Sequence, residues 1–596
     1  MSSKAAASDH WCLDVDLVDA PQQPQSLVRG KFFQLPQRAL WLAGDIRLDN
    51  AQELARLCGM PADAAPAEVV LQLYARRRQA FASCLLGDFS FALYDAGQRV
   101  LWLVRDHMGI RPLYYQFSAG RCIASDSLDA MLTVSQGAPE LNASVVAEWC
   151  QHGHVFNQTE TFYQGIHKVP RASLCRVSRE GVRVESYWSL DAIAPLHYDC
   201  EQDYVEHLHA LLRQAVYSRL PAAGRAAAHS SGGLDSTPIA ILAGRAAREL
   251  GQSFQSYNWC KPTAGHEGDC HEWTDARLVA EQEAFTHVET GTTAADLKRI
   301  MLCHDVSRDG TTMFEYESAV LAHARQVAVG TIFSGFGGDE ILTIRSAEWH
   351  EPALRQGQWF QVWRQLACEA DPDQRWLALR IAARFSRSLA RSMGIWPQAV
   401  LPVVKHQAHL LSHYRPLMRP ETVWCHATVE RGYGQLRTLR QQQHHMIELG
   451  YHQERIESWA ILGERSGVRY AYPYLDKRLV EFALALPSQW YFRRGQNRYL
   501  YRKALGDALP PYLGRKGKLP ERERVKQLMR ARIQALADVQ VHDMIASSDS
   551  SYVDTRALLE QCRKIHALDI TDLNACIAPI RAITTAVLAL NLNRWH

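Results

Sequence analysis

Two short stretches of small, hydroxyl and acidic residues are placed to bind a phosphorylated ligand. The first reads SSGGLDST (residues 230–237) and the second reads SGFGGDE (residues 334–340). Backbone N–H groups of such loops, at the start of a helix, attract anions. We expect the following first-loop residues to contact phosphate: Ser231, Gly232, Gly233, Leu234 and Ser236. Asp235 in the same loop is expected to hold Mg²⁺ on the phosphates.

The second loop provides a matching acid. Gly335, Phe336 and Gly337 are expected to contact the nucleotide, and Asp339 is expected to share the Mg²⁺ with Asp235. The nucleotide P-loop pattern GxxxxGK[ST] is absent, and an aspartate stands where that motif has its lysine. This chemistry suits an enzyme that cleaves ATP between the α- and β-phosphates.

The elements that must position these loops alternate along the chain. From about residue 200, helical periodicity and short apolar strands follow one another, which predicts an α/β doubly wound parallel sheet. Both loops then lie at the carboxyl ends of strands, where open α/β sheets bind ligands. Residues 12 to about 125 instead read as β-rich with two helices, which predicts an α+β domain.

Composition excludes several classes of protein. The 596 residues carry 66 Lys and Arg against 63 Asp and Glu, too balanced for a nucleic-acid-binding protein. The 14 cysteines form no CxxC pair, which favours reduced thiols over disulfides or zinc. No segment reaches the roughly 18 apolar residues of a membrane helix. We therefore expect a cytoplasmic protein with no membrane insertion and no nucleic-acid partner.

Four motifs in order resemble the synthetase domain of the asparagine synthetase family. Besides the two glycine loops they are YPYLDKRLVEFALALP (472–487) and RYLYRKALGDALPPYLGRKGK (498–518). The resemblance implies that a carboxylate is adenylated with ATP and Mg²⁺ and that an amine then displaces AMP. It assigns the metal to Asp235 and Asp339, and charge stabilisation at the α-phosphate to Lys518, with Lys516 and Arg515 as close alternatives.

The N-terminal half resembles the glutaminase domain of the same family. The resemblance rests on LAGDIRLDN (42–50) and GDFSFALYD…LVRDHMGIRPLYY (87–115). It implies an Ntn-hydrolase-like, glutaminase-like αββα domain over 1–195 and an ATP-pyrophosphatase domain over 196–596, with a helical insertion at about 345–470.

The residues of glutamine hydrolysis are missing from this half. The family uses a cysteine directly after the initiator methionine, and this chain has Ser2 there. The first cysteine is Cys12, within an expected strand, and Ala43 stands where the family places an oxyanion-binding asparagine. We therefore expect a structural domain without glutaminase activity.

Family members with an inactive glutaminase half suggest the substrate. They include β-lactam and carbapenam synthetases and the lasso peptide cyclases. Phe336 replaces the family's glutamate or tyrosine at this position and cannot relay a proton. The aromatic and arginine-rich stretch between Glu340 and Tyr472, and the segment beginning QSYNWCKP, resemble a lasso cyclase. A β-lactam synthetase-like or ammonia-dependent asparagine synthetase-like enzyme remains the alternative, and a catalytically inactive peptide-binding scaffold is a third.

A lasso cyclase joins the N-terminal amine of a leader-trimmed precursor peptide to an Asp or Glu side chain. The resemblance thus implies a peptide substrate, a leader peptidase and a leader-peptide recognition protein as partners. The base that accepts the proton of the amine stays open at this point. Four residues near the same sheet edge are candidates: Glu315, Glu317, His304 and Asp305.

Overall fold

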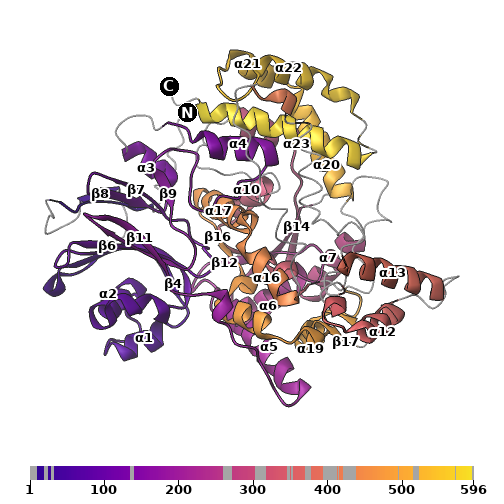
Figure 1. Ribbon diagram of the computed structural model, residues 1–596, viewed down its shortest axis with the longest axis horizontal. Coiled ribbons are helices and arrows are strands. Elements are labelled where there is room, and N and C mark those ends of the chain that lie inside the picture. Colours follow the sequence, from indigo (N-terminus) through magenta and orange to yellow (C-terminus); the bar gives the residue numbers. More distant parts are fainter. Residues whose placement is uncertain are drawn as a thin grey trace.

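The structure is a computed structural model of the chain. It describes residues 10–18, 25–28, 32–134, 140–259, 271–302, 317–344, 350, 353–369, 377–393, 413, 415–419, 438–493, 496–513, 522–568, 570 and 572–593. Figure 1 shows a β-rich N-terminal domain beside a larger α/β domain, with a group of C-terminal helices above both.

The N-terminal domain contains two antiparallel sheets. The five-stranded sheet has the order β2 (Gln25–Val28), β1 (Cys12–Asp16), β8 (Arg121–Ser125), β7 (Tyr114–Ser118) and β9 (Ile166–Lys168). The six-stranded sheet has the order β11 (Gly181–Ser186), β10 (Ser173–Ser178), β6 (Val100–Arg105), β5 (Gly87–Asp95), β4 (Leu40–Leu48) and β3 (Phe32–Leu35). Strands β5 and β6 are buried along almost their whole length, as their near-continuous apolar runs require.

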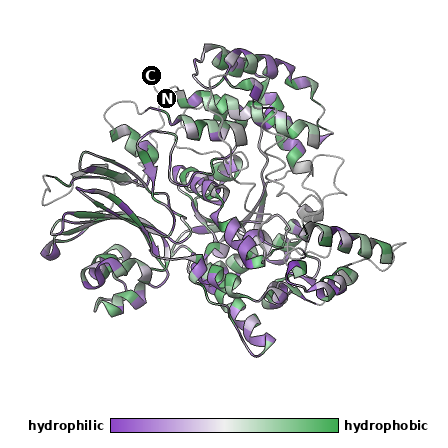
Figure 2. Cartoon of the chain, in the orientation of Figure 1, coloured by the Kyte–Doolittle hydropathy of each residue, from purple (hydrophilic) through white to green (hydrophobic). Residues whose placement is uncertain are grey.

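Helices cover the outer faces of both sheets. Helices α1 (Ala51–Leu57) and α2 (Pro66–Arg77) pack on the six-stranded sheet, and α3 (Leu128–Val134) and α4 (Ala143–His152) pack on the five-stranded sheet. A separate core fills the space between the sheets. In Figure 2 these helices carry both hydrophobic and hydrophilic residues, as amphipathic helices do. The expected αββα layers are therefore present.

The second domain is built on a parallel sheet. Its strands have the order β14 (Thr286–Glu289), β13 (Phe254–Asn258), β12 (Arg225–His229), β15 (Val329–Phe333) and β16 (Arg469–Ala471), all parallel. The connecting helices are α5 (Glu201–Tyr217), α6 (Ser236–Glu249), α7 (His271–Gln282), α8 (Ala294–Leu302) and α10 (Glu317–Gln326). Strands β13 and β14 lie on one side of β12, and β15 and β16 lie on the other. The loops after β12 and β15 therefore meet at the switch point of a doubly wound sheet.

Helices dominate the chain after β15. They are α12 (Trp359–Glu369), α13 (Leu377–Ser392), α16 (Leu439–Glu448), α17 (Gly450–Arg465), α18 (Lys477–Ala485), α19 (Tyr499–Leu505), α20 (Arg522–Leu536), α21 (Val539–Ser547), α22 (Thr555–Lys564) and α23 (Leu573–Leu590), with a small hairpin of β17 (Phe492–Arg493) and β18 (Gln496–Asn497). The predicted insertion at about 345–470 is helical where it is described, except that its last two residues belong to β16. None of the described helices is long and apolar enough to cross a membrane.

The C-terminal helices belong to the same core as the N-terminal domain. Helix α23 packs on α4, and α20 packs on both α8 and α23. The helix layer over the five-stranded sheet is therefore covered by the other end of the chain, as Figure 1 shows.

Buried ion pairs also join the two domains. Arg105 on β6 donates to Glu457 on α17 over 2.7 Å, and Lys168 lies 2.9 Å from the other carboxylate oxygen of Glu457. Farther along, Arg219 lies 2.7 Å from Asp476 and 3.1 Å from Asp88 of the N-terminal domain. Buried charges cost free energy unless they are fully paired, so these networks fix one arrangement of the domains.

Glu457→Gln should destabilise the whole protein. Burial would raise the pKa of Glu457, but Lys168 and Arg105 outweigh it and hold the pKa below the ordinary value of 4.5. Removing one partner of a buried ion pair costs about 3–5 kcal/mol of unfolding free energy. Urea unfolding at pH 7 should therefore show a clear loss of stability for Glu457→Gln.

The stabilising effect of Glu457 should depend on pH. Because the folded-state pKa of Glu457 is lowered, its contribution is complete above about pH 4.5 and is lost as the pH falls through the folded value. The difference between wild type and variant should shrink on acidification. The control is Glu560→Gln, which breaks an exposed pair with Lys564. An equal loss of unfolding free energy in the two variants would contradict the role of the buried ion pairs between the domains.

Candidate active site

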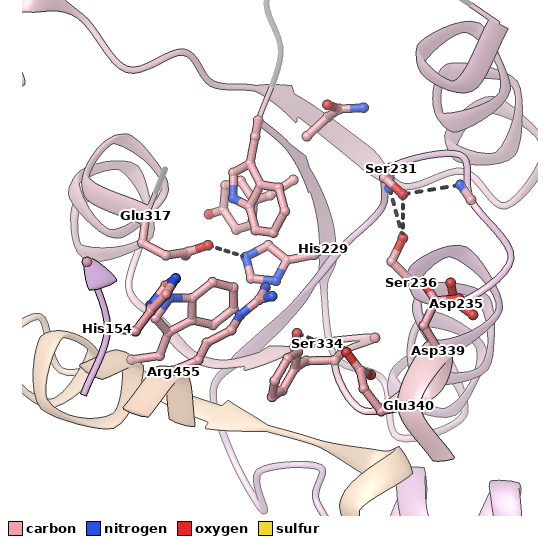
Figure 3. A pocket seen from close by; sticks show the side chains of 18 of the residues that line it. His154, His229, Ser231, Asp235, Ser236, Glu317, Ser334, Asp339, Glu340 and Arg455 are labelled. Carbon is pink, nitrogen blue, oxygen red and sulfur yellow. Dashed lines mark hydrogen bonds and ion pairs between the residues drawn. The ribbon is translucent and has the colours of Figure 1, made fainter. Parts of the chain in front are cut away.

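The two glycine loops touch at the carboxyl end of the parallel sheet. Strands β12 and β15 pair directly, so the loops that follow them emerge side by side. A Cβ on Gly335 would lie 2.5 Å from the Cα of Ser236 and 2.7 Å from the carbonyl carbon of Asp235. Only a residue without a side chain allows this backbone contact. The contact brings Asp235 and Asp339 into one pocket (Figure 3).

Hydrogen bonds within the first loop fix its shape. The backbone N–H of Ser231 donates to the hydroxyl oxygen of Ser236 over 3.0 Å, and the N–H of Gly233 donates to the hydroxyl oxygen of Ser231 over 3.2 Å. The two hydroxyl oxygens lie 2.9 Å apart. Gly232 has a φ of +81°, which lets the backbone turn around the start of α6. A preformed loop of this kind can bind the oxygens of a pyrophosphate.

Cations and hydroxyls converge on the two aspartates. The guanidinium of Arg498 forms an ion pair with Asp339, and its Nη2 lies 3.7 Å from Asp235. Thr343 donates its hydroxyl hydrogen to Asp235. Burial opposes the charge of Arg498, but Asp235 and Asp339 outweigh burial and raise its pKa. Carboxylate oxygens that already attract one cation match the ligands that Mg²⁺ prefers.

A third carboxylate in the pocket holds its proton more tightly than usual. Burial raises the pKa of Glu340 to about 7, and the negative charge of Asp339 contributes in the same direction. Positive charge from Arg455 acts against this increase. Glu340 is thus near its titration point at neutral pH, beside the two aspartates.

The rest of the pocket wall is aromatic and basic. The cavity of about 440 Å³ reaches from the glycine loops to α4 of the N-terminal domain and to α20 and α23. Phe336 and Trp459 lie on either side of the Arg455 guanidinium, whose carbon is 4.3 Å and 4.4 Å from the two ring centres. Figure 3 shows this side of the pocket across from Asp235 and Asp339. The cavity therefore has one end lined by the glycine loops and the acids, which we call the phosphate end, and one aromatic end.

The positions of the predicted residues differ in detail. Those that line the cavity are Ser231, Gly233, Asp235, Ser236, Gly335, Phe336 and Asp339. The side chain of Leu234 instead packs in a small core with Ile241 and Leu513, so only its backbone can face a phosphate. Gly337 has a φ of +93° and packs against Leu475, which is a structural role. Lys518, Lys516 and Arg515 lie outside the described residues, as do Glu315, His304 and Asp305.

Sequence reasoning missed two charged residues of the site and one histidine. They are Arg498, Arg455 and His229. Arg498 opens the fourth motif, and His229 immediately precedes the first loop, so both lay within reach of a motif-based search. Arg455 lies in a helix more than 100 residues from either loop along the chain. No motif around it in the sequence indicates that it belongs to the site.

The N-terminal domain has no accessible cysteine nucleophile in the described part of β1. The Cys12 side chain is fully buried and faces the helix layer, while its neighbour Trp11 fills the space between the sheets. Burial, aided by Asp126 and Asp14, raises the pKa of Cys12 to about 12. A thiol in this state is not the thiolate that a nucleophile needs. Ala43 is buried between the sheets and offers no side-chain donor.

Gly335→Ala should weaken nucleotide binding. The added methyl group collides with the backbone of Ser236, and such overpacking costs about 1–3 kcal/mol. We expect roughly 10-fold or greater loss of MgATP affinity by calorimetry. Gly330→Ala is the matched control, because a Cβ on this glycine of β15 meets nothing within 4 Å. Equal affinities for the two variants would contradict the role of the loop contact.

Comparison with known proteins finds relatives of this chain. A match over 459 residues to "Asparagine synthetase [glutamine-hydrolyzing] 3" of Bacillus subtilis has 23% identity and covers 74% of this chain and 68% of that protein. "Amidase chyE" of Penicillium rubens is 30% identical over 182 residues. That match covers 29% of this chain and 25% of the amidase, so the chain spans a quarter of that relative.

A solved structure and two family matches complete the comparison. The glutamine PRPP amidotransferase of B. subtilis covers 42% of this chain and 60% of its own, at 13% identity and a TM-score of 0.21, too low to bear on the fold. Residues 15–188 match the glutamine amidotransferase domain, and residues 207–596 match asparagine synthase. The second match spans more than half of the chain, and the chain therefore belongs to the asparagine synthase family.

Proposed function

We propose that the protein is a lasso peptide cyclase. It activates an Asp or Glu side chain of a leader-trimmed precursor peptide with ATP, and the N-terminal amine of the peptide closes a macrolactam ring. AMP and pyrophosphate are the other products. A leader peptidase and a leader-peptide recognition protein would supply the trimmed peptide, in the bacterial cytoplasm.

One observation carries this proposal. The acids and glycine loops of the synthetase site converge in one pocket, whereas Cys12 in the N-terminal domain is buried, with its pKa raised to about 12. An enzyme that adenylates a carboxylate but cannot release ammonia from glutamine needs an amine from elsewhere. An amine carried by the substrate itself meets this need.

The aromatic end of the pocket supports a peptide over a small substrate. Phe336 and Trp459 offer flat apolar surfaces, and the cavity continues to α4 and α23 beyond the glycine loops. Aromatic walls bury large apolar area and favour bulky side chains. Holding the peptide so that amine and carboxyl carbon meet is worth up to about 7–11 kcal/mol of the barrier in well-oriented reactions.

The residues of the pocket divide the reaction between them. The peptide carboxylate attacks the α-phosphorus of ATP, and the leaving pyrophosphate is received by the N–H groups and hydroxyls of the first loop, around Ser231 and Ser236. Asp235 and Asp339 would hold Mg²⁺, which supplies positive charge to the phosphate oxygens. Lys518 is proposed to stabilise the charge at the α-phosphate. The amine then attacks the acyl carbon, and AMP leaves.

Asp235→Asn should abolish activation of the carboxylate. The exchange of labelled pyrophosphate into ATP measures this first step by itself. With a leader-trimmed peptide we expect exchange in the wild type and a decrease of about 10²-fold or more in the variant, because the charge on the phosphates is no longer balanced. Full exchange by Asp235→Asn would contradict the metal role of this residue.

The same assay separates the rival functions. Exchange promoted by aspartate or by a small β-amino acid derivative, with none by the peptide, would favour the asparagine synthetase-like or β-lactam synthetase-like alternative. If none of these carboxylates promotes exchange, the result would favour the catalytically inactive peptide-binding scaffold. A product 18 Da lighter than the linear peptide, resistant to N-terminal labelling, would establish ring closure.

Cys12→Ser should leave ring formation unchanged. The thiol is buried and its pKa is about 12, so it has no role as a nucleophile. Glutamine should neither be hydrolysed nor raise the rate in wild type or variant, as measured by glutamate release. Glutamate release that disappears in Cys12→Ser would show that this domain is an active glutaminase.

A further inference from the structure

We propose that His229 is the general base that accepts the proton of the attacking amine. This inference rests on the proposed function, because it concerns the second step of that reaction. Phe336 lines the cavity beside the acids of the second loop, and its ring cannot accept a proton. The proton must therefore go to another group in the same pocket.

A chain of three contacts, two of them cation–π, connects His229 with Phe336. Arg455 stacks on Phe336 and on Trp459, and the ring of Trp459 lies 5.4 Å from that of His229. His229 is the last residue of β12, directly before the loop that receives pyrophosphate. Its imidazole lines the cavity and is 4% exposed. The imidazole is therefore shielded from bulk water and borders the cavity.

One ring nitrogen of His229 lies near a carboxylate. Nε2 of His229 is 3.2 Å from Oε1 of Glu317, at the start of α10 (Figure 3). Both ring nitrogens are buried, and neither has a hydrogen-bond partner among the residues that the structure describes. The carboxylate favours the tautomer with the proton on Nε2 and stabilises the imidazolium that forms later. Nδ1 is then the acceptor.

Glu317 is itself held in place. The hydroxyl of Tyr470 on β16 donates to Oε2 of Glu317 over 2.6 Å. Burial, together with the charge of Glu317, raises the pKa of Tyr470, so the hydroxyl keeps its proton and remains a donor. Tyr470, Glu317 and His229 come from three different elements and form one chain. Glu317 and Tyr470 are positioning residues for the base.

Few charges face His229 from the elements around it. Helix α10 contributes Glu317, β16 contributes Tyr470, and α17 contributes Arg455. The adjacent residue on β13 is Tyr257, whose hydroxyl pairs with His323 over 3.1 Å. Trp259 and Trp459 enclose the ring from two sides.

Glu340 is the rival acceptor, and its position argues against it. It lies beside Asp339 and Asp235, at the phosphate end of the cavity, where a cation bound to these carboxylates would favour its ionised form. His229 lies at the aromatic end, across the pocket (Figure 3). The amine of a bulky substrate is expected at that end.

The step balances as follows. The amine nitrogen forms a bond to the acyl carbon, its proton moves to Nδ1 of His229, and the bond from that carbon to the phosphate oxygen breaks with its electron pair leaving on AMP. The imidazolium is paired with Glu317 and returns its proton to water after AMP departs. No oxidant, reductant or further co-reactant is needed.

The test compares the two half-reactions in His229→Asn. Pyrophosphate exchange with the trimmed peptide should stay within about 2-fold of wild type, because the first step does not use this base. Amide product should fall by about 10²–10⁴-fold, the range for loss of a general base. Glu317→Gln should show a smaller loss of the same kind, and the rise of product formation with pH should change in both variants.

The controls separate a chemical role from a structural one. His207→Asn removes a histidine on α5 that bonds to Tyr198 outside the pocket, and both half-reactions should be unchanged. Equal loss of exchange and product in His229→Asn would show a structural role and overturn the proposal. So would unchanged product formation, or a product-specific loss in Glu340→Gln alone.

The failure of the proposed function would look different. If the true substrates are another carboxylate and another amine, the wild type shows no activity with the peptide. The ratio of the rate of amide formation to the rate of pyrophosphate exchange is then measured with those substrates. A fall of this ratio in His229→Asn supports the base with either substrate. Absence of exchange in wild type with every carboxylate overturns both proposals.

Discussion

The contact between two glycine loops is the constraint on which the site depends. Strands β12 and β15 are neighbours in the sheet, and Gly335 lies against the backbone of Asp235 and Ser236. This close approach places Asp235 and Asp339 in one pocket although they lie far apart along the chain. Arg498 and Thr343 then bond to these carboxylates.

Buried ion pairs hold the N-terminal domain against the synthetase domain. Its Arg105 and Lys168 pair with Glu457, and its Asp88 pairs with Arg219, all in buried positions. Because α17 carries both Glu457 and Arg455, the domain contact also fixes the aromatic end of the pocket. This domain, with its αββα layers and its buried Cys12, therefore contributes part of the wall of the site.

Motif order and hydrophobic alternation predicted most of the framework. The parallel sheet, the two glycine loops and the position of Cys12 within a strand all followed from local patterns. Several short strands were missed, among them β3, β9 and β16, because three or four residues carry too little periodicity. The pairing of α23 with α4 was also beyond local reasoning, since both are ordinary amphipathic helices.

The sequence by itself determined the two glycine loops, the acids within them and the serine at position 2, because each depends on residue type within a few positions. The tertiary structure alone decided which distant groups meet those loops. His229 acquires Glu317, Tyr470 and Trp459 from α10, β16 and α17, and Asp235 and Asp339 acquire Arg498. The physical reason is that ion pairs and aromatic contacts depend on distances of a few ångströms, and chain packing sets these distances.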